Sequence, residues 1–166
     1  ITIENPPNAG QDAILTVCEG DADVALFTLL GVNAELGGIW TNPSGIGHSG
    51  VLNPSSDESG IYTYSINGLS TCPDDEAEVS ITVQEEVTVD GITEVCASSE
   101  LEYTVSFTIS GGDPISYNVS GAGTLIGNIF TSDPITSGSS YSFDVIDASS
   151  CNTVTVSGLI DCICPA

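Results

Sequence analysis

The chain has 166 residues, of which 40% are hydrophobic and 14% are charged. It contains 23 Asp and Glu residues but no Lys or Arg, which gives a formal charge of −23. Nucleic acid is therefore excluded as an ordinary partner, because no cationic side chain is present to neutralise phosphates. An anionic membrane surface would repel the chain for the same reason, and no apolar run reaches the roughly 18 residues that span a bilayer.

The apolar fraction is large enough to form cores, so the chain is not predicted to be a disordered acidic tail. With no initiator Met, no basic leader and no signal peptide, we expect a mature product or a segment of a longer protein. Six Cys in a chain of this length are typical of secreted, oxidised proteins. We therefore expect an extracellular or cell-surface location.

Strands are predicted wherever apolar and polar residues alternate with a period of two. Such stretches occupy residues 61–66, 77–83, 101–109, 141–146 and 153–156. Turn clusters rich in Gly, Pro, Asn and Ser separate them at residues 42–45, 53–56, 111–114 and 132–134. The pattern predicts an all-β protein.

One segment, residues 23–30, departs from this alternation. Its apolar residues Leu26, Leu29 and Leu30 are three and four positions apart, and Asp23 is a credible N-cap for a helix. The segment is compatible with a strand or with one short helix that covers an end of the first sandwich.

The cysteines indicate an internal repeat. The interval from Cys18 to Cys72 nearly equals that from Cys96 to Cys151, and the two pairs are offset by about 80 residues. This period is the size of a small β-sandwich, so we predict two tandem domains, residues 1–85 and 86–166. Because almost no linker separates them, we expect the two domains to stack as a stiff rod.

Several short motifs resemble a known family. They lie at residues 17–21, 37–41, 53–54, 59–64 and 72–73 in the first domain, and at 95–96, 110–112, 117–121, 141–147, 151 and 162–164 in the second. Together they resemble the immunoglobulin-like repeats of Bacteroidota cell-surface proteins, of the adhesin and gliding-motility-associated type that the type IX route secretes. The resemblance implies two immunoglobulin-like β-sandwich domains that act as a non-catalytic extracellular repeat.

Two aromatic residues have specific roles in this interpretation. Trp40 follows two glycines in a strand, where its ring would fill the space between two sheets. The alternative is that Trp40 is an exposed platform on which a sugar stacks. Tyr62 follows Gly60 and lies close to Asp57, as in the tyrosine corner of immunoglobulin-like sandwiches.

The repeat suggests that Cys18 bonds Cys72 and that Cys96 bonds Cys151. Closing loops of this length would stabilise each domain by about 4 kcal/mol. Cys162 and Cys164 remain unassigned, because cysteines one residue apart rarely bond each other without strain. They compete with Cys151 for Cys96, or link to a following domain or another chain.

Without Lys or Arg, each carboxylate must face water, a backbone N–H or a metal ion. A Cys18–Cys72 bond would gather six carboxylates at one end of the first domain, which calcium would relieve. The six are Glu19, Asp21, Asp23, Asp74, Asp75 and Glu76. A second candidate calcium site lies at the domain junction and consists of Glu85, Glu86, Asp90 and Glu94. The alternative is a solvated acidic surface that binds no specific ion.

Catalysis is not expected. The single histidine, His48, lies in the Gly-rich segment 44–50 without the context of a catalytic triad. Asp74 and Asp75 are adjacent on a turn, so they would not converge on one substrate atom as a glycosidase pair does. No phosphate-binding loop with its Lys and no Rossmann fingerprint is present.

The leading interpretation is thus a structural or adhesive repeat of a surface adhesin or filament, with neighbouring repeats or other copies of the chain as partners. In one variant the chain polymerises by donating residues 1–4 as an edge strand, because these residues alternate suitably. The alternative class is a carbohydrate-binding module that binds surface polysaccharide through Trp40.

Overall fold

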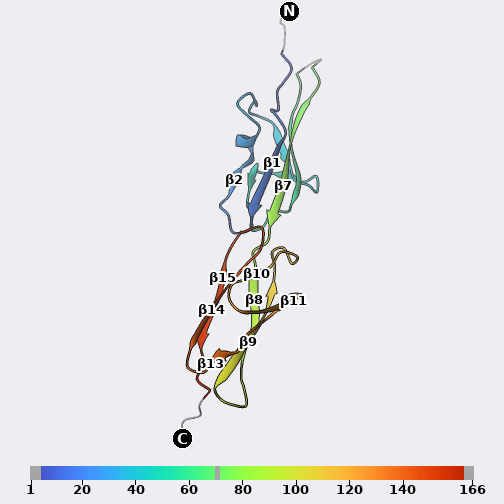
Figure 1. The fold of residues 1–166 in the computed structure, drawn as a ribbon. Coiled ribbons are helices and arrows are strands. Elements are labelled where there is room, and N and C mark those ends of the chain that lie inside the picture. Colours follow the sequence, from blue (N-terminus) through green and yellow to red (C-terminus); the bar gives the residue numbers. More distant parts are fainter. Residues whose placement is uncertain (1–4, 70–71, 163–166) are drawn as a thin grey trace, which may run out of the picture. The chain divides into compact units, whose positions relative to one another are not determined.

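The computed structural model describes residues 5–69 and 72–162 (Figure 1). The chain divides into two compact units, Ile1–Gln84 and Glu85–Ala166, one residue before the boundary expected from the sequence. Both units are built from strands, which confirms the all-β class. Each unit is described separately below.

Unit 1 contains a five-stranded sheet and a two-stranded sheet. The larger sheet has the order β1–β7–β6–β3–β4. Its edge strand β1 pairs in parallel with β7 (Figure 1). The smaller sheet pairs β2 with β5. The strands are β1 (Ala13–Cys18), β2 (Val24–Ala25), β3 (Ile39–Thr41), β4 (Gly47–His48), β5 (Val51–Leu52), β6 (Gly60–Ile66) and β7 (Asp75–Gln84).

The core of unit 1 is formed by the inward-facing positions of the long strands. β6 and β7 alternate buried and exposed residues, so that Tyr62, Tyr64 and Val79 face inward and pack in one cluster with Leu26 and Leu52. Burying a side chain of this size stabilises the fold by about 1.5–3 kcal/mol. The period-two patterns predicted at residues 61–66 and 77–83 are thereby confirmed.

The segment that was compatible with strand or helix contains both. Val24 and Ala25 form β2, and a four-residue 3-10 helix, Leu26–Leu29, follows directly. Leu26 and Leu30 are buried in the core, which explains the apolar spacing. The expected N-cap is wrong, because Ala25 occupies the cap position and no side chain caps the helix.

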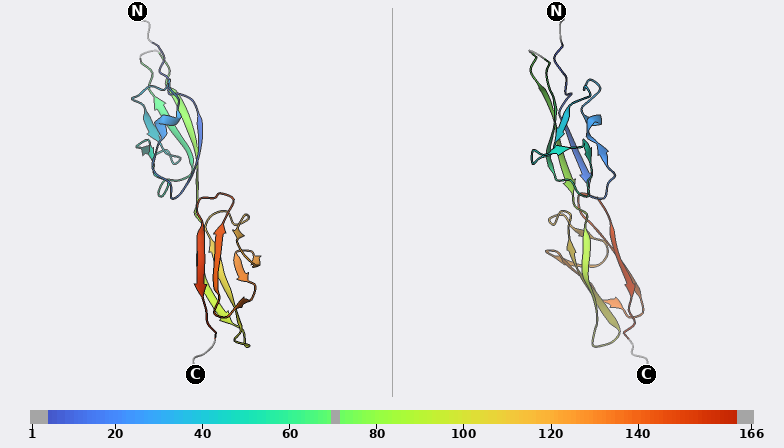
Figure 2. Two further views of the ribbon diagram at one scale, coloured as in Figure 1. Left: turned by 60° about the vertical axis from the view of Figure 1, so that its left-hand side comes forward. Right: turned by 180° about the vertical axis from the view of Figure 1, so that it is seen from behind.

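Unit 2 is a sandwich of two sheets. One sheet pairs β8 with β9 and continues through β12 to β11, and the short β13 extends along the same edge of β9 as β12. The other sheet has the order β10–β14–β15, and its two long strands lie side by side (Figure 2). The strands are β8 (Thr88–Cys96), β9 (Glu102–Ser110), β10 (Asn118–Val119), β11 (Gly123–Ile126), β12 (Ile129–Ser132), β13 (Ile135–Thr136), β14 (Ser140–Ile146) and β15 (Val154–Leu159).

This pairing is that of the seven-stranded immunoglobulin sandwich. In that fold the first, second, fifth and fourth strands form one sheet, and the third, sixth and seventh form the other. Apart from the short β13, the strands of unit 2 follow this order. The core between the sheets is aromatic: Phe107 lies 5.0 Å from Phe130 and 6.3 Å from Phe143, measured between ring centroids. Unit 2 is therefore an immunoglobulin-like sandwich.

The predicted tyrosine corner is present in unit 1. Tyr62 is buried in β6, and its hydroxyl donates a hydrogen bond of 2.9 Å to the backbone oxygen of Glu58, four residues upstream. Burial, together with the charges of Asp57 and Glu58, raises the pKa of Tyr62, so the hydroxyl keeps its proton at neutral pH. This contact fixes the entry of the chain into β6.

Replacing Tyr62 by Phe should lower the free energy of unfolding of unit 1 by about 1 kcal/mol, the usual net value of one hydrogen bond. The ring stays in the core, so the loss isolates the contact with the Glu58 oxygen. Urea denaturation followed by the fluorescence of the single Trp, Trp40, measures it. Tyr64→Phe, which removes the hydroxyl bound to the Glu35 oxygen, serves as the comparison. An unchanged midpoint for Tyr62→Phe would contradict the structural role of the corner.

Candidate functional site

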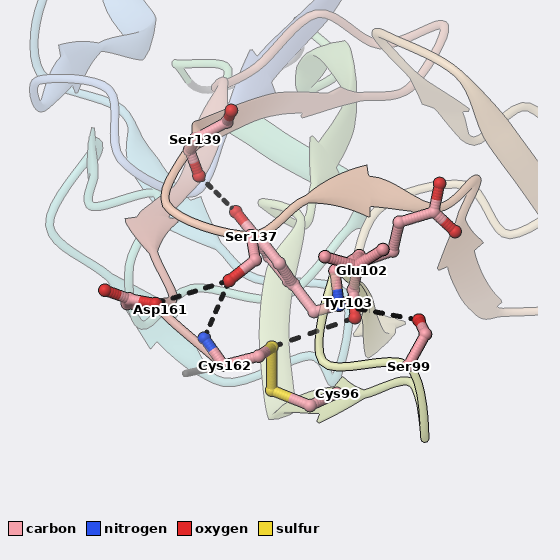
Figure 3. Close-up of a disulfide and its surroundings, with 9 residues drawn as sticks. Cys96, Ser99, Glu102, Tyr103, Ser137, Ser139, Asp161 and Cys162 are labelled. Carbon is pink, nitrogen blue, oxygen red and sulfur yellow. Dashed lines mark hydrogen bonds between the residues drawn. A yellow bond between two sulfur atoms is a disulfide. The ribbon is translucent and has the colours of Figure 1, made fainter. Parts of the chain in front are cut away.

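The disulfide of unit 2 joins Cys96 to Cys162, not to Cys151 as the repeat suggested. The two Cα atoms are 5.8 Å apart, within the usual range for a disulfide. Ser137 secures the segment around the bond, because its hydroxyl oxygen accepts the N–H of Cys162 at 2.8 Å (Figure 3). The bond thus connects the end of β8 to the chain just after β15.

The strand register explains why the predicted partner was wrong. Cys96 lies beside Tyr103, whose hydroxyl reaches the oxygen of Ser139 at the start of β14. Cys162 follows the end of β15, which pairs with that same start of β14. Cys151 lies in the turn at the other end of the β14–β15 hairpin, about 20 Å away along strands that rise about 3.3 Å per residue. Cys151 is itself disulfide-bonded.

The predicted Cys18–Cys72 bond is also wrong. Cys72 is a free, partly exposed thiol, whereas Cys18 is disulfide-bonded. Parallel pairing places Cys18 beside Gln84 at the end of β7, and Cys72 precedes the start of that strand. The length of β7 therefore separates the two cysteines by about 30 Å. Cys164 lies outside the described residues.

The same register divides the predicted calcium cluster. Glu19, Asp21 and Asp23 follow the end of β1, while Asp74, Asp75 and Glu76 lie at the opposite end of the neighbouring β7. The six carboxylates therefore do not meet. Within residues 5–69 and 72–162, no group of three or more His, Cys, Asp or Glu side chains is arranged to hold a metal ion.

Several of these carboxylates instead accept hydrogen bonds from nearby backbone N–H groups. Asp21 accepts the N–H of Cys18, Asp74 that of Gly68 and Asp75 that of Ala9, each at 2.8 Å. The sequence analysis allowed each carboxylate to face water, a backbone N–H or a metal ion. For these three residues a backbone N–H is observed. These residues stabilise turns and chain ends.

One member of the proposed junction cluster makes a hydrogen bond within unit 2. Glu94, an exposed residue of β8, accepts the hydroxyl of Tyr141 at 2.7 Å. Burial, reinforced by this hydrogen bond and by the charge of Glu94, raises the pKa of Tyr141 to about 12. Because the unfolded state loses this proton near pH 10, Tyr141 stabilises unit 2 below pH 10, and its contribution falls as the pH rises toward 12.

His48 is held in one orientation by its neighbours. The Gly50 N–H donates to Nδ1 at 3.2 Å, so the proton of the neutral ring is on Nε2, which lies 3.3 Å from Asp57 Oδ2. That oxygen also accepts the N–H of Asn53 at 2.7 Å. Both ring nitrogens and the carboxylate are thus used to hold the loop around β4 and β5. This arrangement supports a structural role for His48.

Trp40 is a core residue and not an exposed sugar platform. Its side chain is only 6% exposed, and its ring centroid lies 5.1 Å from that of Tyr64 on the neighbouring strand. Gly50 packs against the indole: a Cβ at this position, where φ is +80°, would lie 2.6 Å from the ring. The role proposed for Trp40 in carbohydrate binding is therefore wrong.

Unit 2 contains a buried carboxylate that no sequence pattern indicated. Asp147 is 4% exposed and organises the loop after β14. Its Oδ2 accepts the N–H of Asp113 at 2.6 Å, and its Oδ1 accepts the hydroxyl of Ser149 at 2.5 Å and the N–H groups of Ser149 and Ser150. In the sequence, Asp147 is marked only by the turn-forming residues Asp-Ala-Ser-Ser at 147–150. Such a turn does not indicate that its Asp is buried.

Burial and hydrogen bonding act in opposite directions on Asp147. Burial alone raises the pKa of a carboxyl, but the hydrogen bonds from Ser149, Asp113 and Ser150 favour the charged form. The net effect lowers the pKa of Asp147 below its ordinary value. Gly112 allows this approach, because a Cβ at Gly112, where φ is +55°, would lie 2.6 Å from Oδ2.

No helix among the described residues is long and apolar enough to cross a membrane. Residues 1–4, which would act as the donated strand, lie outside the described part of the chain.

No protein-family model matches the sequence, and no curated protein matches it either. Among solved structures, the chain is similar to Sidekick-1 immunoglobulin domains 1–4, with 13% sequence identity and a TM-score of 0.48. The match covers 92% of this chain and 47% of that one, so the chain spans about half of the structure it resembles.

Proposed function

We propose that the chain is a non-catalytic structural and adhesive segment of an extracellular, cell-surface protein. The observation that carries the proposal is an immunoglobulin-like sandwich closed by the Cys96–Cys162 disulfide. Disulfides persist in oxidising compartments, and small sandwiches of this kind depend on them for stability. The fold and its covalent closure both fit a module that works outside the cell.

The arrangement of the chemically capable side chains supports a non-catalytic role. His48 and Asp57 hold a loop, and Asp147 holds another by four hydrogen bonds. A catalytic base needs a free lone pair directed at a substrate. In these residues the lone pairs are directed at backbone N–H groups and hydroxyls of the same unit.

The sequence motifs suggest the class of surface protein to which the segment belongs. Their resemblance to repeats of Bacteroidota adhesins and gliding-motility-associated proteins supports a repeat in a type IX-secreted surface protein, with neighbouring repeats as partners. The net charge of −23 keeps such a segment soluble at the cell surface.

Labelling of intact cells tests the location. Antibodies raised against the purified 166-residue chain should label unpermeabilised cells of the source organism, while antibodies against a cytoplasmic protein should not. Labelling that requires permeabilisation would refute the proposal.

Replacement of the segment separates its two roles. If the two units are exchanged for two unrelated immunoglobulin-like units of similar length, an adhesive role predicts reduced attachment of cells to their surface. A purely structural role predicts unchanged attachment, whereas deletion of residues 1–166 should reduce attachment in both cases.

A further inference from the structure

The outer face of the large sheet in unit 1 carries an acidic groove with apolar walls. The groove has a volume of about 290 Å³ and lies across β1, β7 and β6. Its lining residues are Asp12, Ala13, Ile14, Ile61, Glu78 and Ser80. All of them belong to unit 1, and none takes part in the hydrogen bonds of the loops described above.

The strand register produces the groove. Ile14, Ser80 and Ile61 lie side by side on three neighbouring strands. Ser80 is the smallest of the three, so the two isoleucines form the walls of a hollow above it. Both are exposed for apolar residues, Ile14 by 83% and Ile61 by 49%. The row therefore offers uncovered apolar surface.

Two carboxylates lie beside this apolar row. Asp12 Oδ1 accepts the backbone N–H of Glu78 at 2.9 Å, which holds the Asp12 carboxylate over β7 next to the exposed side chain of Glu78. Glu78 is two residues before Ser80 on the same strand, and hence on the same face, about 7 Å away. An arginine or lysine side chain has this reach.

We propose that this groove binds an arginine or lysine side chain of a basic partner protein. The aliphatic stem lies over Ser80 between Ile14 and Ile61, and the cationic head lies between the carboxylates of Asp12 and Glu78. Long cationic side chains bind in this way when their stem covers apolar surface and their head reaches a carboxylate.

Charge excludes these 166 residues, in the same or in a second copy, as the source of the occupant. The chain has no Lys or Arg, so neither the chain itself nor a second copy supplies such a side chain. A second copy would also bring a further charge of −23 to an acidic face. The inference rests on the proposed adhesive function, because it names the chemistry of the partner to which such a segment would bind.

NMR titration of the purified chain tests the groove. The probe is the peptide acetyl-Gly-Val-Arg-Val-Gly-amide, and the control probe has citrulline, which is neutral, in place of arginine. Binding of the arginine peptide should shift the backbone amide signals of Ile14, Ile61, Glu78 and Ser80, and the citrulline peptide should not. The absence of these shifts would overturn the inference.

Charge variants separate the groove from general attraction to an acidic protein. Asp12→Asn with Glu78→Gln should weaken binding by about fivefold, the effect of losing modest surface ion pairs. The amide oxygen of Asn can still accept the Glu78 N–H, which preserves the local fold. Glu19→Gln with Asp23→Asn removes the same net charge elsewhere and should change binding by less than about twofold. Equal weakening by the two double variants would overturn the site.

Filling the hollow between the two isoleucines tests their role without changing the charge. Ser80→Leu should abolish the shifts, while Thr82→Leu, at the next exposed position of β7, should leave them unchanged. Undiminished binding to the Ser80→Leu variant would overturn the inference. Because these measurements use the purified chain, their failure would leave the cell-surface labelling and the attachment results unaffected.

Discussion

Removing the Cys96–Cys162 disulfide is expected to lower the free energy of unfolding of unit 2 by about 4 kcal/mol. The two cysteines are 66 residues apart, and a loop of this length costs about that much to close in the chain-entropy account. A domain of about 80 residues is stable by only roughly 4–12 kcal/mol, so the loss is a large share. The melting temperature of unit 2 should fall by roughly 15–30 °C.

The double variant Cys96→Ala/Cys162→Ala tests this by hydrogen exchange of β9 and β14, which report on unit 2. The fluorescence of Trp40, the single Trp, reports on unit 1 in the same sample. Cys72→Ser is the matched control, because Cys72 is a free thiol, and its effect should stay within about 0.5 kcal/mol.

Mass spectrometry tests the pairing directly. Trypsin has no Lys or Arg at which to cut, so a protease that cleaves before Asp is required, because a cut at Asp161 places Cys151 and Cys162 on different peptides. The unreduced digest should contain a linked pair of peptides with Cys96 and Cys162. A link between Cys96 and Cys151 would contradict the structure.

Asp147→Ala is expected to lower the free energy of unfolding of unit 2 by about 3 kcal/mol. The change leaves the N–H groups of Asp113 and Ser149 without this acceptor in a partly buried loop, whereas the Ser150 N–H keeps the backbone oxygen of Asp147. Unsatisfied groups of this kind cost about 1–3 kcal/mol each, and solvent reduces the total where the loop is exposed. Urea denaturation followed by hydrogen exchange of β14 measures the loss.

Asp147→Asn should destabilise unit 2 as well, by about 2 kcal/mol. Donors approach both carboxylate oxygens, so the amide NH₂ group necessarily faces at least one of them. Asp133→Asn makes the same change of charge at an exposed residue and should have an effect within about 0.5 kcal/mol. Equal effects of the two Asn variants would contradict the role of Asp147.

The lowered pKa of Asp147 also predicts a pH dependence. A carboxyl whose folded pKa lies below its unfolded value stabilises the fold above the unfolded pKa, and the contribution is lost as the pH falls through the folded value. The contribution of Asp147 should therefore be complete at neutral pH and decline below about pH 4. The difference in stability between the wild-type chain and Asp147→Asn should shrink in this range.

Four carboxylates of this all-acidic chain are held by hydrogen bonds within the fold. Asp21, Asp74 and Asp75 each accept a backbone N–H, and Asp147 accepts three. A charged acceptor strengthens such hydrogen bonds. The turns of this protein are thus held by carboxylates in places where a neutral side chain would make a weaker contact.

Local patterns in the sequence were enough to predict the class of fold and much of its core. Alternation with a period of two located five of the long strands, because one face of each is buried and the other is solvated. It also identified Tyr62 as a tyrosine corner, since the Gly–x–Tyr spacing at the start of a strand is local information. Trp40 was expected in the core, and it lies there.

Which distant residues come together could not be predicted in this way. The parallel pairing of β1 with β7 separates Cys18 from Cys72 and divides the six carboxylates, and the β14–β15 hairpin separates Cys96 from Cys151. Equal spacing along the chain predicts a repeat but does not say at which end of a strand each residue lies. That depends on strand direction and register, which are fixed by contacts between distant segments, and the same register places Asp12 and Ile14 beside Glu78 and Ile61.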